Sequence, residues 1–469
     1  MLVAKRRFWA KNIGNGVNSV LVANAKSTKP PSACLPLARQ SFLTFKRLRV
    51  RLPFRQVYIQ LDYGLAPILC VAVLLAASVI DVNFVVRGIV GCENIRPYSI
   101  IILISSLSYI CTSLDFTGFF EYIALRVVKR AGSSGRRLFV YLFLLTSFLT
   151  LFTSNDVVIL TITPIILYTC SNVATSPVPF LFAQFFAANI AGMGLYVGNP
   201  TNIVVADAYG LSFAEFARWM LMPAVSAMAS CLLMLWLVFR QKVPVQIAPP
   251  QVDPRQTIKD RKGAVFGLAV LASAIKVMSL PQTWTGLQPW MVAAVFALIM
   301  FVHDLLVARS KIPTVLKRMP WKIAPFLIGL FVVVESLAFS GWTDMLAVQL
   351  SKVSTNIVVA VFTIGFLSSL AAGLMNNHPM TIFFVKTLQN PSFSVPQTAK
   401  FGAMLALVIG SNLGANFMLT GALAGLMWAE ILSNKGCFIP FSEFSKQGLK
   451  TMPVVAAACL TLVGVLTFT

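Results

Sequence analysis

Apolar residues fill most of the chain from Leu65 onward, in runs separated by short polar or charged stretches. Several runs have the ~20 residues that a helix needs to cross a bilayer. The runs cover residues 65–82, 98–114, 137–170, 178–198, 219–240, 263–280, 287–308, 322–340, 354–390, 399–414, 416–433 and 452–468. The pattern predicts an all-α polytopic membrane protein.

Two of these runs, 137–170 and 354–390, are far too long for one membrane span, and each is broken in the middle by polar residues. The breaks are Thr153-Ser154-Asn155-Asp156 and Asn376-Asn377-His378-Pro379. Each run therefore predicts a re-entrant helical hairpin with its tip at membrane depth, where non-helical backbone is tolerated only inside protein or at an aqueous cavity.

The same order of features occurs twice. An amphipathic segment precedes each hairpin, at 118–128 and 341–353, and a helix with a polar break follows it, at Gly198–Asn202 and Gly410–Asn416. Hairpins and broken helices in corresponding places of two halves are typical of the substrate site of a secondary transporter. We therefore expect two inverted-topology repeats, each with a re-entrant hairpin and a broken transmembrane helix.

Composition supports the membrane assignment, because 57% of the 469 residues are hydrophobic and 11% are charged, against about 45–50% and 25% in soluble domains. The net charge of +23 is explained by membrane topology, since short cytoplasmic loops are rich in Lys and Arg, and we expect no nucleic-acid partner. Clusters at 129–137, 242–262 and 309–322 predict three cytoplasmic loops. From the number of membrane spans between these loops, we expect the first hairpin to open toward the cytoplasm and the second toward the opposite side.

These observations divide the chain into four parts. Residues 61–240 form the first transmembrane repeat, 241–262 a basic cytoplasmic linker and 263–469 the second repeat. Residues 1–60 contain no acidic residue and are expected to be a basic cytoplasmic tail, a transit peptide or the product of an early start codon. We expect the protein in the cell membrane, or in an organellar membrane if residues 1–60 are a transit peptide.

The polar breaks provide the candidate binding site. A broken helix exposes backbone groups that can bind ions or oxygen-rich solutes, and small polar side chains add ligands without filling the cavity. The alternative is that Asn and Ser only hold helices together. The candidates are Thr153, Ser154, Asn155, Asp156, Asn199, Thr201 and Asn202 in the first half, and Asn376, Asn377, Thr381, Ser411, Asn412, Asn416 and Thr420 in the second.

Three ionisable residues inside apolar runs are candidates for ion coupling, because buried charges in membranes are costly and usually functional. Asp156 could bind a proton or cation, or could be the N-cap of a helix over 157–170. His378 could titrate near neutral pH or could occupy a plain turn before a proline. Glu335 could pair with Lys276 or Lys386.

The sequence offers no constellation for catalysis or a metal site. Two histidines and cysteines without a CxxC pair give neither a zinc motif nor a nucleophile–base arrangement. A transporter therefore fits better than a membrane-embedded enzyme or a structural scaffold. We expect no cofactor, no metal, and H⁺ or Na⁺ as the coupling ion.

Several motifs resemble arsenical pump membrane proteins, the arsenite efflux permeases of the ion transporter superfamily that includes sodium/proton antiporters and dicarboxylate and citrate carriers. The resemblance covers about residues 65–468. Its motifs are Ser154-Asn155-Asp156 with Thr163-Pro164-Ile165, Asn199…Asn202-Ile203-Val204, Pro320-Trp321-Lys322, Gly341-Trp342-Thr343-Asp344, Met375-Asn376-Asn377-x-Pro379 and Gly410-x-x-Leu413-Gly414.

The resemblance implies efflux of arsenite or antimonite in exchange for protons, with a sodium/proton antiporter or a carboxylate carrier as the alternative. It also raises an accessory ATPase or a homodimer as possible partners. The chain departs from the family at the second break, where the family usually has an acid and a lysine and this chain has Asn412 and Asn416. His378 stands where the family commonly has an apolar residue. Asp156 is then the main coupling candidate.

Overall fold

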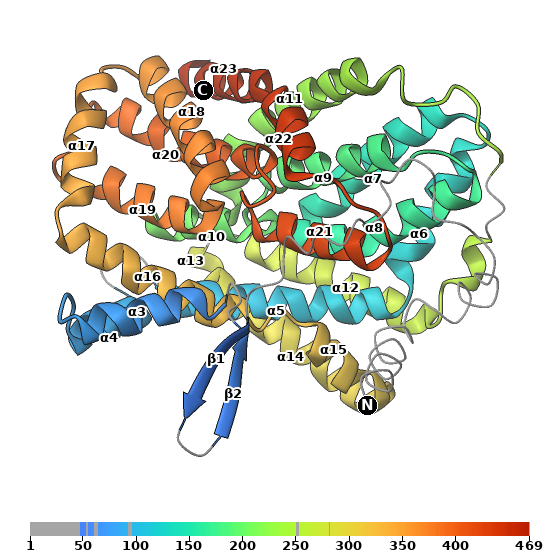
Figure 1. Cartoon of the computed structure of the whole chain (residues 1–469), viewed down its shortest axis with the longest axis horizontal. Helices are drawn as coiled ribbons and strands as arrows, with labels where there is room; N and C mark the ends of the chain where they lie inside the picture. The colour runs from blue at the N-terminus through green and yellow to red at the C-terminus, as the bar shows by residue number, and fades with distance from the viewer. Residues whose placement is uncertain are drawn as a thin grey trace.

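The computed structural model describes residues 47–52, 55–60, 64–91, 96–249, 253–280 and 282–468 (Figure 1). Helices make up nearly all of this part of the chain, and eight helical stretches in it are long and apolar enough to cross a membrane. The protein is a polytopic membrane protein. Of the expected basic tail, only the antiparallel hairpin of β1 (Arg47–Leu52) and β2 (Arg55–Gln60) belongs to the described residues.

The first half follows the predicted runs closely. Its helices are α3 (Ala66–Ala76), α4 (Val82–Val90), α5 (Pro97–Phe116), α6 (Phe119–Ala131), α7 (Gly135–Phe152), α8 (Asn155–Asn172), α9 (Val178–Gly192), the 3₁₀ turn η1 (Tyr196–Gly198), α10 (Pro200–Ala208) and α11 (Phe213–Phe239). The single span expected over 65–82 is wrong. The chain turns after α3, with Ser78 in the left-handed region at φ 55°, and α3 and α4 both pack against α16 at one edge of the molecule (Figure 1).

The second half repeats this order after the linker. Its elements are η2 (Pro254–Gln256), α12 (Arg261–Met278), α13 (Gln282–Thr285), α14 (Pro289–Val307), η3 (Arg309–Lys311), α15 (Ile312–Arg318), α16 (Ile323–Phe339), α17 (Trp342–Val353), α18 (Ile357–Met375), α19 (Asn377–Gln389), α20 (Gln397–Leu413), η4 (Gly414–Asn416), α21 (Leu423–Asn434), α22 (Phe441–Leu449) and α23 (Met452–Phe468). Most apolar runs of this half thus became helices with their ends shifted by only a few residues, whereas in the run 416–433 the helix α21 begins only at Leu423.

The two broken helices differ in detail from the prediction. The first break lies between α9 and α10, before Pro200, so that Thr201 and Asn202 begin a helix instead of lying in the break. The second lies between α20 and α21, and Ser411 and Asn412 belong to the last turn of α20. The second break begins later than predicted because the helical hydrogen bonds of α20 continue through Leu413. Gly410 does not interrupt the helix, and it lets α20 approach α18 closely.

Packing partners correspond between the halves. Helix α7 packs on α9 as α18 packs on α20, and α8 packs on α21 as α19 packs on α10. The amphipathic α6 and α17 both follow a glycine in the left-handed region, at φ 82° and 80° respectively. Helix α11 packs against its counterpart α23 (Figure 1). The two halves therefore share one plan of packing as well as one order of elements.

The three basic clusters lie at one end of the helices. The Ile247 amide of the linker donates to the Ser133 carbonyl at 2.9 Å, and the Lys259 amide donates to the Thr117 carbonyl at 3.0 Å. Arg318 of the third cluster lies 3.5 Å from the Asp115 carboxylate at the end of α5. The contacts group the clusters as expected for loops on one side of a membrane.

Helix α20 packs extensively and closely on α18, and glycine makes this packing possible. Small residues recur every fourth position along α20, at Gly402, Ala406, Gly410 and Gly414, the pattern that lets membrane helices approach closely. A Cβ built on Gly410 would overlap the Ser368 side chain, and one on Gly414 would overlap the Ser369 carbonyl. Both positions thus require glycine.

We expect Gly410→Ala to lower the free energy of unfolding by about 1–3 kcal/mol, because the added methyl group overpacks the contact with α18. Gly464→Ala in α23 is the matched control, since a Cβ there meets no atom within 4 Å, and alanine favours a helix over glycine by about 1 kcal/mol. Thermal unfolding of the detergent-solubilised variants measures the difference. Equal stability of the two variants would contradict this account of the packing.

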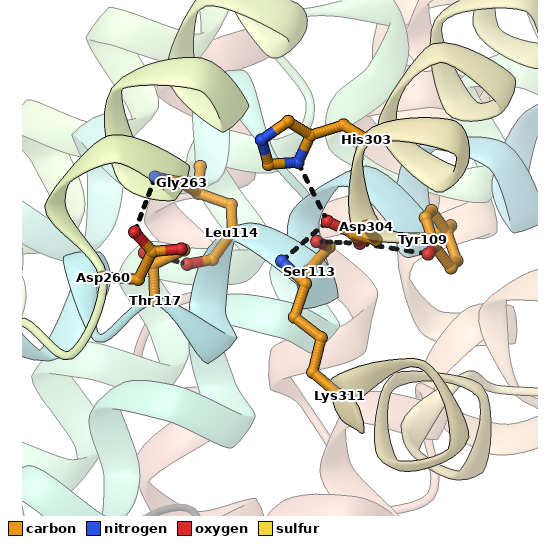
Figure 2. Close-up of polar contacts among 9 residues, drawn as sticks. All are labelled: Tyr109, Ser113, Leu114, Thr117, Asp260, Gly263, His303, Asp304 and Lys311. Atoms are coloured by element: carbon orange, nitrogen blue, oxygen red, sulfur yellow. Dashed lines mark hydrogen bonds and ion pairs between the residues drawn. The ribbon is translucent and has the colours of Figure 1, made fainter. Parts of the chain in front are cut away.

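A buried carboxylate ties the two halves together near the basic end (Figure 2). Asp304 of α14 is fully buried, and it accepts hydrogen bonds from Ser113 Oγ at 2.6 Å and Tyr109 Oη at 3.0 Å, both on α5. Lys311 Nζ lies 2.7 Å from the same carboxylate. His303 Nδ1 lies 3.3 Å away, and its ring stacks on Phe266 of α12. The sequence analysis missed Asp304, although an acid within an apolar run was the signal.

We expect Asp304→Ala to destabilise the protein by about 3–5 kcal/mol, because it leaves the buried Lys311 ammonium without its counter-ion. Asp344→Ala is the control. Asp344 accepts one hydrogen bond from Asn390 at an exposed site, where substitutions usually change stability by less than about 0.5 kcal/mol. Comparing the unfolding midpoints tests this, and a small effect of Asp304→Ala would show that the cluster does not hold α5 to α14.

Candidate functional site

The first hairpin tip lies between α7 and α8. Thr153 turns its hydroxyl back onto the Leu149 carbonyl at 2.7 Å. Ser154 is the N-cap of α8, and Asp156 lies in the first turn of the helix, so the expectation that Asp156 caps a helix over 157–170 is wrong. The helix begins two residues earlier because the Ser154 hydroxyl accepts from the Val157 amide. The half-buried Asp156 carboxylate has no hydrogen-bond or ion-pair partner among the described residues.

The second tip lies between α18 and α19, and Asn376 forms it in the left-handed region at φ 77°. Its side chain caps α19 by accepting from the His378 amide, and it donates to the Thr420 carbonyl at 3.0 Å. His378 therefore belongs to the first helical turn and not to a plain turn before the proline. Its Nδ1 lies 3.3 Å from Asn376 Oδ1, and its ring edge meets Phe326.

The two tips place different groups at equivalent positions. In each, the cap is followed by an asparagine, Asn155 or Asn377, at the first helical position. The second helical position holds Asp156 in α8 and His378 in α19. A carboxylate in one half thus corresponds to an imidazole in the other.

Buried asparagines connect the first tip to the second broken helix. Asn155 Nδ2 donates to Asn189 Oδ1 of α9 at 3.0 Å, and Asn189 Nδ2 donates to Asn416 Oδ1 of η4 at 2.9 Å. All three residues are buried. Asn189 was missed by the sequence analysis, although an amide inside the apolar run 178–198 was the available signal.

A second set of bonds joins the two broken helices directly. Asn199 Nδ2 donates to Asn412 Oδ1 at 2.9 Å, and Asn412 Nδ2 donates to Asn202 Oδ1 at 2.8 Å. The hydroxyl groups of Thr201 and Ser411 lie 3.1 Å apart. Candidates from the two halves therefore bond to one another in two buried sets at the broken helices. We call the two sets together the asparagine network: residues 155, 189, 199, 201, 202, 377, 411, 412 and 416.

Much of this network satisfies broken backbone. Asn202 Nδ2 donates to the carbonyls of Gly192 and Leu195 at 2.7 and 2.8 Å, at the first break. At the second break, the backbone N–H of Asn377 donates to the Gly421 carbonyl, and the side-chain Nδ2 of Asn377 donates to the Ser411 carbonyl at 3.2 Å. Buried polar groups without such partners are costly. The structural alternative raised for these asparagines thus describes part of their role.

Other candidates lie at the margin of the network. The Thr381 hydroxyl is bonded to the Asn377 carbonyl of its own helix. Thr420 is exposed and contributes its carbonyl oxygen. Glu335 pairs with Lys386 at 3.1 Å, which confirms one of its two expected partners.

Three buried polar atoms of the network and its tips have no hydrogen-bond partner among the described residues: Asn377 Oδ1, Asn416 Nδ2 and His378 Nε2. An unsatisfied buried group in a folded protein requires an explanation, and a bound ligand or water is the usual one. One acceptor, one donor and one imidazole nitrogen suit a small solute that carries hydroxyl groups. No group of three or more His, Cys, Asp or Glu side chains in the described part of the chain could hold a metal ion.

Comparison with known proteins shows the family. A family model described as "Citrate transporter" matches residues 59–410. The arsenical pump membrane protein of Escherichia coli (strain K12) is 32% identical over 362 residues, covering 76% of this chain and 84% of that protein.

Two further relatives agree. The arsenical pump membrane protein of Yersinia enterocolitica is 31% identical over 412 residues, covering 86% of this chain and 94% of that protein. A 46 kDa membrane protein of Mycobacterium leprae is 27% identical over 360 residues, covering 75% and 82%. Together with the helical fold, these matches confirm the resemblance found in the motifs. The chain is a multi-pass integral membrane transporter that belongs to the family described by the citrate transporter model and shared with its relatives, the arsenical pump membrane proteins.

Proposed function

We propose that this protein exports arsenite or antimonite in exchange for protons. The observation that carries the proposal is the buried asparagine network, in which both hairpin tips and both broken helices meet. The two halves would lie inverted in the membrane, with the first hairpin entering from the cytoplasmic side and the second from the opposite side. The names of the arsenical pump relatives support the choice of solute.

The chemistry of the network fits this solute. Arsenous acid carries three hydroxyl groups and is uncharged near neutral pH, so that it needs donors and acceptors and no counter-ion. Asn377 Oδ1 can accept a hydrogen bond from such a hydroxyl, and Asn416 Nδ2 can donate one. His378 Nε2 can do either, depending on its tautomer.

Asp156 is the proposed coupling residue. Asp156 directly follows Asn155 of the network in the sequence, and its carboxylate has no hydrogen-bond or ion-pair partner among the described residues. It can therefore bind a proton or a sodium ion without first breaking an ion pair. Glu335 is less suited to bind the coupling ion because it already forms an ion pair with Lys386. His378 is the second candidate for the coupling residue.

A sodium-coupled carboxylate carrier is the alternative function, and the description of the matching family model favours it. Uptake into everted membrane vesicles decides between the two. Arsenite, citrate and sodium are offered in turn, with and without an imposed proton gradient. Gradient-dependent uptake of arsenite supports the proposal, and uptake of citrate driven by sodium in its place would overturn it. We place the protein in the cell membrane, with an organellar membrane as the alternative.

We expect Asn377→Ala to lower kcat/KM for arsenite at least tenfold, because it removes the unpartnered acceptor and one bond to the second break. A tenfold loss corresponds to about 1.4 kcal/mol of transition-state stabilisation. Asn434→Ala is the control, since Asn434 is exposed at the end of α21. Equal kcat/KM for the two variants, at equal expression, would exclude Asn377 from the binding site.

We expect Asp156→Asn to abolish the dependence of arsenite transport on the proton gradient while exchange of arsenite without a gradient continues. Ser154 remains the cap, so the helix is kept. Linkage requires that a coupled ion and the solute change each other's affinity by the same factor, so arsenite affinity should also lose its pH dependence.

The control for this experiment is Glu430→Gln, an exposed acid on α21. Full gradient-driven transport by Asp156→Asn would show that Asp156 does not couple transport, and the same pair of measurements would then be made on His378→Gln.

A further inference from the structure

A cleft of about 760 Å³ opens at the end of the helices away from the basic loops. Its walls come from both halves. The first half contributes the start of α5 and residues from η1, α10 and the chain after α10, and the second half contributes the starts of α14 and α20 and the end of α19. The lining residues are Arg96, Tyr196, residues 206–211, Gln288, Pro289, Gln389 and Lys400.

The position of the cleft follows from helix α5. Arg96 of the cleft directly precedes its first residue, whereas Asp115, which contacts Arg318 of a basic loop, lies in its last turn. A helix of 20 residues is about 30 Å long, the thickness of the hydrophobic part of a bilayer. The cleft and the basic loops thus lie at opposite ends of a membrane-spanning helix, and the cleft faces away from the cytoplasm.

Positive charge predominates among the residues that line the cleft. Arg96 and Lys400 are cationic, and Asp207 is the one acid among these residues. The Asp207 carboxylate is already held, because it accepts from Ser99 Oγ at 3.2 Å and from the Arg96 amide at 3.5 Å. Within the described part of the chain, no carboxylate lies at ion-pair distance from Lys400. Among the described residues, the cleft therefore offers in Lys400 a cation without a fixed counter-ion.

Two further lining residues have unsatisfied polar atoms. In the part of the chain that the structure describes, the Tyr209 hydroxyl and Gln389 Oε1 are buried and have no hydrogen-bond partner, although Gln389 Nε2 donates to the Ala208 carbonyl at 2.8 Å. A phenolic O–H is a donor that an anionic oxygen can accept from. Gln389 Oε1 is itself an acceptor and does not bind an anion, so the Tyr209 hydroxyl is the second observation, independent of the charges, that indicates a ligand with acceptor oxygen atoms.

We propose that this cleft binds a small oxyanion through Lys400 and Arg96. The chemistry is that of a carboxylate or phosphate group, which a free solute or the headgroup of an anionic lipid can supply. The site differs from the asparagine network, since α10, a helix of nine residues and thus about 13 Å long, separates Asn199 from Ala208. An anion bound between walls from both halves stabilises the conformation in which the cleft is open.

The test uses the full chain in nanodiscs of phosphatidylcholine. Succinate is the anionic probe and succinamide is its uncharged counterpart, and thermal stabilisation measures binding, because a ligand that binds the folded state raises its stability with concentration. Lys400→Gln should weaken succinate binding about tenfold and Lys400→Arg should retain it. Lys352→Gln is the matched control, since Lys352 is exposed near the end of α17 and does not line the cleft.

The proposal predicts stabilisation of the wild type by succinate and none by succinamide. Phosphatidylglycerol in the nanodisc distinguishes the sources, because loss of the succinate effect there identifies a lipid headgroup as the occupant, and its persistence identifies a free solute. No stabilisation of the wild type by succinate in phosphatidylcholine, or the same stabilisation of Lys400→Gln, overturns the proposal. Arsenite flux is measured separately, so failure here leaves the proposed function untouched.

Discussion

The structure depends on one constraint: backbone groups freed by a break in a membrane helix must find partners inside the protein, because lipid offers none. In this protein, asparagine side chains provide these partners. Asn202 binds two carbonyls at the first break, and Asn376 binds the Thr420 carbonyl at the second. The need for such partners explains why polar residues gather at the two breaks, where the chain is otherwise apolar.

The same amides join the halves. Asn412 of α20 bonds with both Asn199 and Asn202 of the first half, and Asn189 bonds with Asn416. Any motion of one half against the other must exchange these bonds. A solute with its own hydroxyl groups can replace them one by one, so a network that stabilises the resting fold is also suited to bind a polar solute. Structural and binding roles of the asparagines are therefore not alternatives.

Two acidic residues, Asp304 and Asp156, differ in whether nearby groups balance their charge. Asp304 is buried but has Lys311, Tyr109 and Ser113 as partners, and it holds α5 against α14 (Figure 2). Asp156 has no partner among the described residues and lies at a hairpin tip. The two acids have different surroundings, and on this difference rests our proposal that Asp156, and not Asp304, is the coupling residue. What distinguishes them is whether the surrounding groups already balance the charge.

The sequence by itself determined the class of protein, the helices and the two hairpins. Hydrophobicity acts on each stretch of about 20 residues independently of its neighbours, so runs such as 98–114 and 452–468 became α5 and α23 nearly unchanged. It also identified the polar residues of both breaks, because an amide in an apolar run is conspicuous without a structure.

Only the tertiary structure decided where the breaks fall and which polar groups meet. Ser411 and Asn412 remain helical because Gly410 lets α20 pack closely on α18, and the turn after α3 occurs where both α3 and α4 can pack on α16. The bond of Asn189 to Asn416 joins residues 227 positions apart. Such contacts depend on how the two halves dock, and the local pattern of apolar and polar residues does not encode that docking.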